Sequence, residues 1–255
     1  MVNVFGTDET RGPPGRNGKD GENGKPNIST TFFGKFLLKW FNELLTLSFY
    51  FDTPTSGIKI KDGKAVALIN QTGGNNANPI NDVGTLSKIP FSGKYALNFK
   101  DTVYKVDDVD WTTALTEKAI FIFAFKTNTT NKQYIFHTKN TYGALREIYL
   151  EHDNIVINDD AVIEYCKNSW NICYIEYGQS SSYWINGKTG TFTTKETQYE
   201  DLILYIGGKD GHTFTGSIAR FDFYSQHHLK DEILPVDIRD IIISQFEDLV
   251  LVTIE

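Results

Sequence analysis

The sequence is poor in cysteine, in basic residues and in long apolar segments. Its 255 residues include only two cysteines, too few for a disulfide framework, so Cys166 and Cys173 are interpreted as buried free thiols, with a bridge between them as the alternative. The formal net charge of −7 disfavours nucleic acid as a partner, because phosphate binding requires a basic surface. No membrane span is predicted, since the most apolar run is short for a bilayer and is interrupted by charged residues.

Motifs for catalysis and for metal binding are also missing. No serine or cysteine lies in a nucleophile motif, and the five histidines lack zinc-ligand spacing with cysteines or carboxylates. Two groups of acidic and amide residues offer the oxygen ligands that calcium prefers but not the EF-hand spacing, and we interpret them as solvated turns. They are Asp107, Asp108 and Asp110, and Asp153, Asn154, Asn158, Asp159 and Asp160. We predict no cofactor, with calcium as the alternative.

The most regular feature that is present is a run of glycines with a period of three. The glycines at every third position of 12–26 are Gly12, Gly15, Gly18, Gly21 and Gly24. Only glycine fits at the crowded axis where three polyproline-like chains wind together, so this run predicts a collagen-like triple-helical stem. The resemblance to collagen covers these triplets alone, and a flexible Gly-rich linker is the alternative. Because ordering each residue costs backbone entropy, so short a stem needs a trimerising element beside it.

The segment after the stem, 29–46, has the spacing of a coiled-coil seam. Apolar residues recur in steps of four and three, which is the a/d pattern of a helical interface between chains, at Phe33, Leu37, Trp40, Leu44 and Leu47. Ser29 or Thr30 can cap the start of the helix. We therefore predict a short trimerisation helix over 29–46, with a core helix of a monomer as the alternative. Residues 1–11 are interpreted as an N-terminal anchoring tail.

The remaining chain, 47–255, has the pattern of one β domain. Asn70–Gly84 is rich in Asn, Gly and Pro and predicts a long surface loop. Short β-prone runs follow, separated by turn residues such as Asn186–Gly187, a strong hairpin signal. The runs are Tyr95–Phe99, Ala119–Phe125, Gln133–His137, Arg146–Leu150, Asn154–Ile157, Trp170–Tyr177, Ser182–Ile185, Leu202–Ile206 and Gly216–Tyr224. Many strands without intervening helices predict an all-β, two-sheet jelly-roll sandwich.

The C-terminal stretch supports two competing interpretations. A helix can begin after Pro235, because proline is well tolerated in the first turn of a helix. Alternation of apolar residues within Phe246–Ile254 is instead typical of a last strand. The sequence does not choose between them.

Several motifs of the β domain follow one another in a distinctive order. They are Tyr95–Phe99, the hairpin Ser182–Lys188, the strand end Leu204–Gly208, the closing strand Phe214–Tyr224 and His228–Ile233. This order resembles the concanavalin A-like superfamily in its laminin G-like and pentraxin-like branches, over about 47–243. The resemblance implies a concanavalin A-like jelly roll that commonly binds carbohydrate or protein, in some members with calcium at a loop edge. It rests on structural residues and therefore bears on the fold more than on activity.

Retaining glycoside hydrolases with this jelly roll carry two glutamates four residues apart on one strand face, with an aspartate between them. The resemblance assigns Glu147 as the nucleophile and Glu151 as the acid/base. Tyr149 stands where that aspartate is expected. The favoured interpretation is therefore the polar outer face of a strand, and we predict that the protein is not an enzyme.

Aromatic residues near predicted loops are candidates for a binding site, because sugars pack their apolar faces on aromatic rings. We predict ligand-binding roles for Trp111, Tyr142, Tyr183, Trp184 and Tyr199. The competing interpretation for each ring is a place in the core, since tryptophan is usually largely buried.

Together these patterns predict a homotrimeric attachment protein. The N-terminal residues lack the basic segment and apolar core of a secretory leader, which favours a fibre or spike on the surface of a virion or phage particle. We expect the tail to bind a capsid or base protein and the lectin-like head to bind a glycan or protein receptor, with avidity from three heads. A secreted, extracellular collagen-like recognition or matrix protein is the alternative. A glycoside hydrolase that uses Glu147 and Glu151 is a lesser one.

Overall fold

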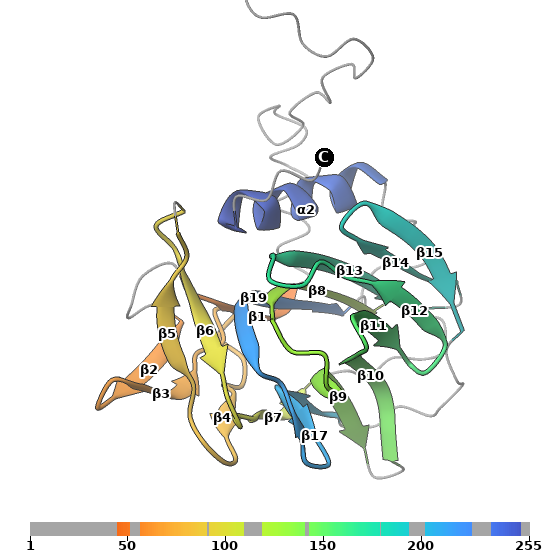
Figure 1. Ribbon diagram of the computed structural model, residues 1–255. Helices are drawn as coiled ribbons and strands as arrows, with labels where there is room; N and C mark the ends of the chain where they lie inside the picture. The colour runs from red at the N-terminus through yellow and green to blue at the C-terminus, as the bar shows by residue number, and fades with distance from the viewer. Residues whose placement is uncertain are drawn as a thin grey trace, which may run out of the picture.

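The computed structural model describes residues 45–51, 57–90, 92–109, 119–140, 143–178, 180–193, 202–225 and 236–250. The predicted tail, the stem and nearly all of the trimerisation helix lie outside the described residues. The described chain forms two antiparallel sheets packed face to face, two small hairpins and one helix, α2 (Val236–Val250) (Figure 1). The predicted all-β sandwich is confirmed.

The eight-stranded sheet has the order β15–β14–β13–β8–β19–β6–β5, and β1 pairs with the second half of β19. The predicted Asn186–Gly187 turn joins β14 to β15, and both residues have the positive φ, 48° and 85°, that a two-residue hairpin turn requires. The strands are β1 (Leu45–Tyr50), β5 (Thr85–Lys88), β6 (Tyr95–Phe99), β8 (Ala119–Lys126), β13 (Asn171–Tyr177), β14 (Ser181–Ile185), β15 (Lys188–Phe192) and β19 (Gly216–Ser225).

The seven-stranded sheet has the order β12–β11–β10–β9–β16–β7–β4. Its strands are β4 (Asn78–Pro79), β7 (Tyr104–Val109), β9 (Gln133–Asn140), β10 (Gly143–Glu151), β11 (Asn154–Ile157), β12 (Ala161–Glu164) and β16 (Leu202–Ile206). The separate hairpins are β2 (Ile58–Lys61) with β3 (Lys64–Leu68), and β17 (Gly208–Lys209) with β18 (His212–Thr213). The stretch Asn70–Gly84 is irregular, as predicted, apart from β4 and isolated bridges to neighbouring segments.

Phenylalanine side chains fill the space between the two sheets. The ring of Phe121 in β8 stacks on Phe136 of β9, with centroids 4.5 Å apart, and on Phe223 of β19, with centroids 4.8 Å apart. All three side chains are fully buried. Since alternate residues of a strand share a face, the odd-numbered phenylalanines of β8 all point into this core.

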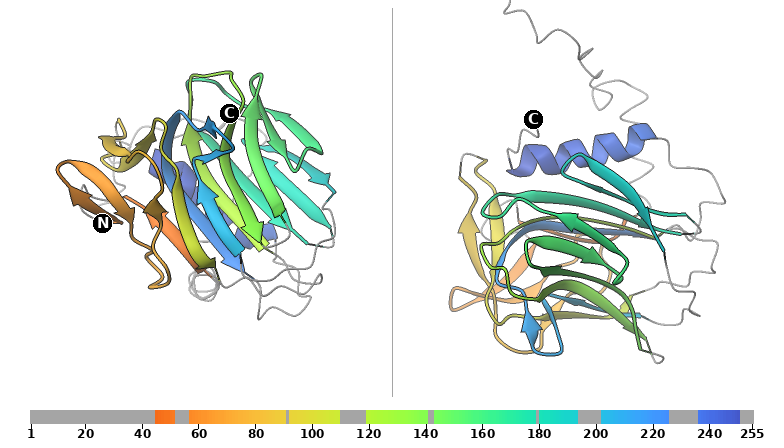
Figure 2. Two further views of the ribbon diagram at one scale, coloured as in Figure 1. Left: turned by 90° about the horizontal axis from the view of Figure 1, so that it is seen from below. Right: turned by 45° about the vertical axis from the view of Figure 1, so that its right-hand side comes forward.

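The other face of β8 is buried as well, because helix α2 lies across it (Figure 2). Ile120 and Ile122 of β8 belong to a second apolar cluster that contains Phe246 and Leu249 of the helix. Burial on both faces explains why β8 reads as an uninterrupted apolar run instead of an alternating one. Within the described residues, we find no helix with the length and hydrophobicity that crossing a bilayer demands.

The same contact decides between the two predictions for the C-terminal stretch. A helix after Pro235 is confirmed, and the strand predicted to start at Phe246 is wrong over 246–250. The apolar residues Phe246, Leu249 and Val250 are three and four positions apart, so a helix places all of them against the sheet.

The prediction that Leu47 ends the trimerisation seam is wrong. β1 already begins at Leu45, and the side chains of Leu47 and Phe49 lie in the core of their own chain. A side chain buried between the two sheets cannot also contact a neighbouring chain. The other seam residues, Phe33, Leu37, Trp40 and Leu44, lie outside the described residues and stay predictions.

The two cysteines are free thiols and not a bridged pair. Cys173 of β13 is fully buried, as predicted, and burial raises the pKa of its thiol. Cys166 is exposed, so the prediction of burial is wrong for this residue. It lies in the segment between β12 and β13.

Replacing Phe121 by alanine should lower the free energy of unfolding by about 3–5 kcal/mol, because it leaves a cavity where three rings stack. Denaturant unfolding of the purified full chain measures this change. Val162→Ala is the matched control, since Val162 is 63% exposed and its truncation should cost no more than about 0.5 kcal/mol. Equal stability of the two variants would contradict the central place given to this stack.

Candidate functional site

Helix α2 packs against the eight-stranded sheet and leaves the outer face of the seven-stranded sheet open (Figure 2). Lys105 of β7, Tyr205 of β16, His137 of β9 and Glu147 of β10 are successive register partners on adjacent strands. The residues that alternate with them face the core. The four side chains therefore form one row across the sheet, pointing away from the core.

The β17–β18 hairpin begins where β16 ends, and it packs on β9. The residue at its base, Gly207, has a φ of 96°, and a Cβ atom there would lie 2.6 Å from Phe99 Cδ1 and from the carbonyl oxygen of Thr102. Only glycine allows both this backbone conformation and this close approach. The Gly207 N–H donates a hydrogen bond to the Ile135 carbonyl of β9 at 2.8 Å, which ties the hairpin base to the sheet.

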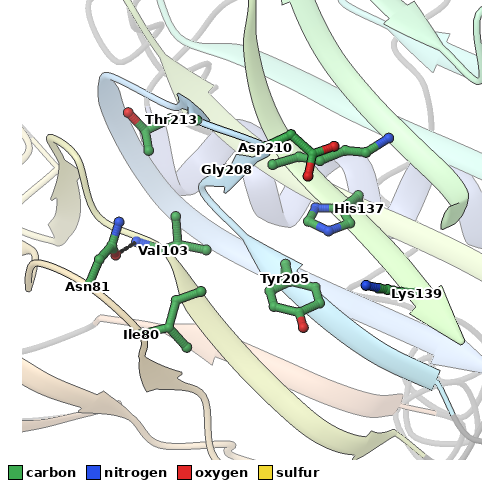
Figure 3. A pocket seen from close by; sticks show the side chains of 11 residues that line it. Ile80, Asn81, Val103, His137, Lys139, Tyr205, Gly208, Asp210 and Thr213 are labelled. Carbon is green, nitrogen blue, oxygen red and sulfur yellow. Dashed lines mark hydrogen bonds between the residues drawn. The ribbon is translucent and has the colours of Figure 1, made fainter. Parts of the chain in front are cut away.

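The hairpin, the sheet and the segment after β4 surround a hollow of about 460 Å³. This volume is within the range of small-molecule sites in proteins. In Figure 3 the side chains converge on the hollow from three sides. The sheet supplies His137, Lys139 and Tyr205, the hairpin supplies Asp210 and Thr213, and the opposite wall carries Ile80, Asn81 and Val103.

Two stacked rings lie beside this hollow. The rings of Tyr205 and His137 are parallel to within 2°, and their centroids are 4.6 Å apart. His137 is buried and covers one face of the half-buried Tyr205 ring. The opposite face of Tyr205 is turned towards the wall that carries Ile80 and Asn81 (Figure 3). A planar apolar surface is thus available between polar groups.

The imidazole of His137 is neutral at physiological pH. Burial, and next the nearby ammonium group of Lys209, lower its pKa from 6.5 to about 4, although Asp210 and the Gly208 backbone act in the opposite direction. Its Nδ1 atom is buried and has no hydrogen-bond partner among the described residues. The ring therefore acts as a neutral stacking group and not as a cation.

Lys209 fixes the hairpin on the sheet through two contacts. Its ammonium group forms an ion pair with the Glu147 carboxylate, and both side chains are largely buried. The same nitrogen lies 5.1 Å from the centroid of the Tyr134 ring. Burial, with Glu147 as the next cause, raises the pKa of Tyr134 to about 12, so this phenol is neutral as well. By contrast, the exposed Lys139 has no carboxylate partner in the described part of the chain.

The structure does not bring the sequence-predicted ligand-binding residues together. Trp111, Tyr142 and Tyr199 lie outside the described residues. Tyr183 and Trp184 are neighbours in β14 and point to opposite faces of the eight-stranded sheet, where Tyr183 packs on the central core and Trp184 on the cluster under α2. Neither ring lines the hollow, and a binding role for either stays a prediction.

The arrangement around Glu147 and Glu151 differs from that of a catalytic pair. Glu147 is engaged by Lys209, and the intervening Tyr149 donates a hydrogen bond from its hydroxyl to Asp159 at 2.7 Å. Of the two acidic groups noted in the sequence, Asp107 forms an ion pair with Lys105, and the Asp160 carboxylate accepts a hydrogen bond from the Thr193 N–H. Among the described residues, no group of three or more His, Cys, Asp or Glu side chains is placed to hold a metal ion.

Sequence reasoning missed the residues that line the hollow. No local signal singles out Tyr205, because Leu202–Ile206 is a continuous apolar run whose two faces cannot be told apart from the sequence. The partnership with His137 was not readable, since 68 residues separate the two along the chain (205 − 137). Only the pairing of β16 with β9 brings them together.

Comparison with solved structures shows which fold this is. The chain is similar in structure to binding domains of botulinum neurotoxins. The match to the serotype D binding domain has 14% sequence identity and a TM-score of 0.53, and it covers 82% of this chain and 53% of that chain. The serotype DC domain in complex with rat synaptotagmin II has 17% identity and a TM-score of 0.53, covering 82% and 52%. A third match is to a structure of botulinum neurotoxin type C, a toxin whose cell entry is described as dependent on interaction with two ganglioside molecules. It has 15% identity and a TM-score of 0.52, and it covers 80% of this chain and 53% of that chain.

The chain thus shares its fold with part of these domains and spans about half of their length. At such low identity the likeness concerns the fold and not the ligand. No family model matches the sequence, and no curated protein matches it either.

Lowering the pH should destabilise the protein partly through His137. Its pKa is lower in the folded chain than the ordinary 6.5, so the unfolded chain binds more protons and stability falls as the pH drops from 6.5 towards 4. His137→Gln should reduce the loss of unfolding free energy between pH 7.5 and 4.5 by roughly 2–3 kcal/mol. Denaturant unfolding at the two pH values measures this loss, and His212→Gln is the control because His212 is exposed. If the natural chain and both variants lost the same unfolding free energy, His137 would not be a source of the pH dependence.

Proposed function

We propose that the sandwich is a carbohydrate-recognition head that uses the hollow on the outer face of the seven-stranded sheet. The observation that carries this proposal is the Tyr205 ring, backed by neutral His137 and surrounded by hydrogen-bonding side chains. Sugars present an apolar face of C–H groups and a rim of hydroxyls. An aromatic plane with polar groups at its edges is complementary to both.

The polar groups of the hollow can take distinct parts in holding a sugar. The side-chain oxygen of Asn81 accepts a hydrogen bond from the Val103 N–H at 2.7 Å, which orients the amide. The carboxylate of Asp210 accepts hydrogen bonds from hydroxyls, and the ammonium group of Lys139 donates to sugar oxygens. The positions of the three groups around Tyr205 favour a ring-shaped polar ligand over an extended apolar one.

The proposal is binding and not hydrolysis. A retaining glycosidase needs two carboxyl groups about 5 Å apart, one of them able to donate a proton. Among the described residues that line the hollow, Asp210 is the sole carboxylate. The nearby Glu147 carboxylate is held in an ion pair with Lys209. The structural neighbours, which are described as binding domains, support a recognition role for this fold.

We further propose that the head is displayed in three copies on the surface of a virion or phage particle. The support is the glycine-repeat stem and the apolar seam that precede β1 in the sequence. Three linked heads would convert weak single-site binding into avidity. In this arrangement the N-terminal tail binds a capsid or base protein.

Tyr205→Ala should weaken sugar binding at least tenfold, equivalent to about 1.4 kcal/mol, because the stacking plane is lost. Tyr205→Phe is the matched variant and should keep most of the affinity. Saturation-transfer NMR of the full chain against a panel of neutral, amino and carboxylated monosaccharides identifies a binder, and titration then compares the variants. A sugar that binds all three proteins equally would place the site elsewhere, and no binder in the panel would count against a carbohydrate-binding head.

Removing residues 1–44 should convert a trimer into a monomer. This boundary keeps β1 intact, which begins at Leu45. Light scattering of the full chain should give three times its monomer mass of 28.9 kDa. The truncated chain should give the mass of a single copy of the shortened chain. Replacing Gly18 and Gly21 by alanine tests the stem separately and should lower the melting temperature of the trimer. A monomeric full chain would exclude trimeric display.

A further inference from the structure

Ile80 differs from the other residues that line the hollow because it is both apolar and exposed. Its side chain is 56% exposed, and of the three large apolar side chains that the described surface leaves open it is the one that lines the hollow. A single exposed isoleucine is ordinary on a protein surface. This one lies on the wall opposite the Tyr205 ring, so a molecule bound in the hollow would cover it (Figure 3).

The backbone of Ile80 is fixed by the residue that precedes β7. Its N–H donates a hydrogen bond to the Val103 carbonyl at 2.9 Å. The Val103 side chain also lines the hollow and packs against the hairpin, since a Cβ atom added at Gly208 would lie 2.7 Å from Val103 Cγ2. Ile80 and Val103 therefore form an apolar patch on the wall of the hollow.

An amide donor lies directly beside this apolar patch. The side-chain oxygen of Asn81 accepts a hydrogen bond from the Val103 N–H at 2.7 Å. Asn81 is exposed, and its NH2 group donates no hydrogen bond to any of the described residues. The wall thus offers a ligand an apolar surface and an N–H donor next to each other.

The charges around the hollow are balanced. Lys139 and Asp210 have opposite charges, and Lys209 is already paired with Glu147. Among the described lining residues, a carboxylated sugar would be attracted by Lys139 and repelled by Asp210, and an amino sugar would meet the reverse. A neutral substituent avoids both repulsions.

We infer that the sugar held in the hollow carries an acetamido group. This inference rests on the carbohydrate-binding role proposed above and specifies the class of sugar. The sugar ring lies on Tyr205, and the methyl group of the substituent packs on Ile80 and Val103. Its carbonyl oxygen accepts a hydrogen bond from the NH2 group of Asn81. A plain hexose would leave Ile80 uncovered, and a 6-deoxy sugar would supply a methyl group but no carbonyl for Asn81.

The test is NMR titration of the full chain with sugars that share one ring and differ in one substituent. Glucose, glucosamine and N-acetylglucosamine form one series, and the galactose compounds form a second. Glucuronic acid and 6-deoxygalactose are added as competitors of other chemistry. In at least one series the N-acetyl sugar should bind about tenfold more tightly than the parent hexose and the amino sugar, because a buried methyl group and a hydrogen bond both contribute.

Two substitutions should change this preference without altering Tyr205. Ile80→Ser should weaken binding of the N-acetyl sugar about fourfold, through loss of the contact with its methyl group, and leave the parent hexose unchanged. Asn81→Asp keeps an oxygen for the Val103 N–H but replaces the donor by a second carboxylate oxygen. It should weaken binding of the N-acetyl sugar and strengthen binding of the amino sugar.

Val162→Ser is the matched control, because Val162 is exposed in β12 and does not line the hollow. It should bind every sugar as the natural chain does, and circular dichroism should show that all variants are folded.

The outcomes separate this inference from the proposed function. Equal binding of parent hexose and N-acetyl sugar, with both lost in Tyr205→Ala, would overturn the acetamido group and leave a carbohydrate-binding head. Tighter binding of glucosamine, glucuronic acid or 6-deoxygalactose would overturn it in the same way. So would a preference that is unchanged in Ile80→Ser and in Asn81→Asp. If no sugar bound, both proposals would fail.

Discussion

The apolar contact between α2 and the eight-stranded sheet determines which side of the sandwich can meet a ligand. Phe246 and its neighbours bury one outer face, and β8 is apolar on both sides as a result. The seven-stranded sheet carries alternating strands instead, with an apolar face towards the core and a polar face outwards. Charged and aromatic side chains are therefore concentrated on a single broad surface, and the hollow lies there.

The site itself depends on a short hairpin held down at two points. Gly207 allows the chain to turn sharply at the end of β16, and the Lys209–Glu147 ion pair fixes the hairpin across β9. Because that pair is largely buried, it constrains position more strongly than an exposed pair would. The hairpin in turn buries His137, which keeps the imidazole neutral beside Tyr205. Binding geometry and electrostatics thus have the same structural cause.

Much of the fold could be predicted because its strands are strongly patterned. Runs such as Tyr95–Phe99 and Leu202–Ile206 have the predicted bounds, and Asn186–Gly187 forms the predicted turn. The strands that were missed, among them β2, β5 and β12, are only four residues long and mostly exposed, so a hydrophobic period such as the Ile-Lys alternation of β2 is too brief to mark them. Leu47 was misassigned because the steps of four and three that mark a helical seam continue by chance into β1, which begins at Leu45.

The sequence by itself determined the class of the fold, since alternation, turn residues and double-sided apolar runs are local properties that specify strands and their burial. It also contains the glycine period and the seam that predict a trimer. The tertiary structure alone decided the candidate site. Tyr205, His137 and Asp210 meet only through strand pairing and a folded-over hairpin, and Tyr183 and Trp184 are separated because adjacent strand residues face opposite ways. Contacts between residues far apart in the chain follow from register and layer packing, which no local pattern records.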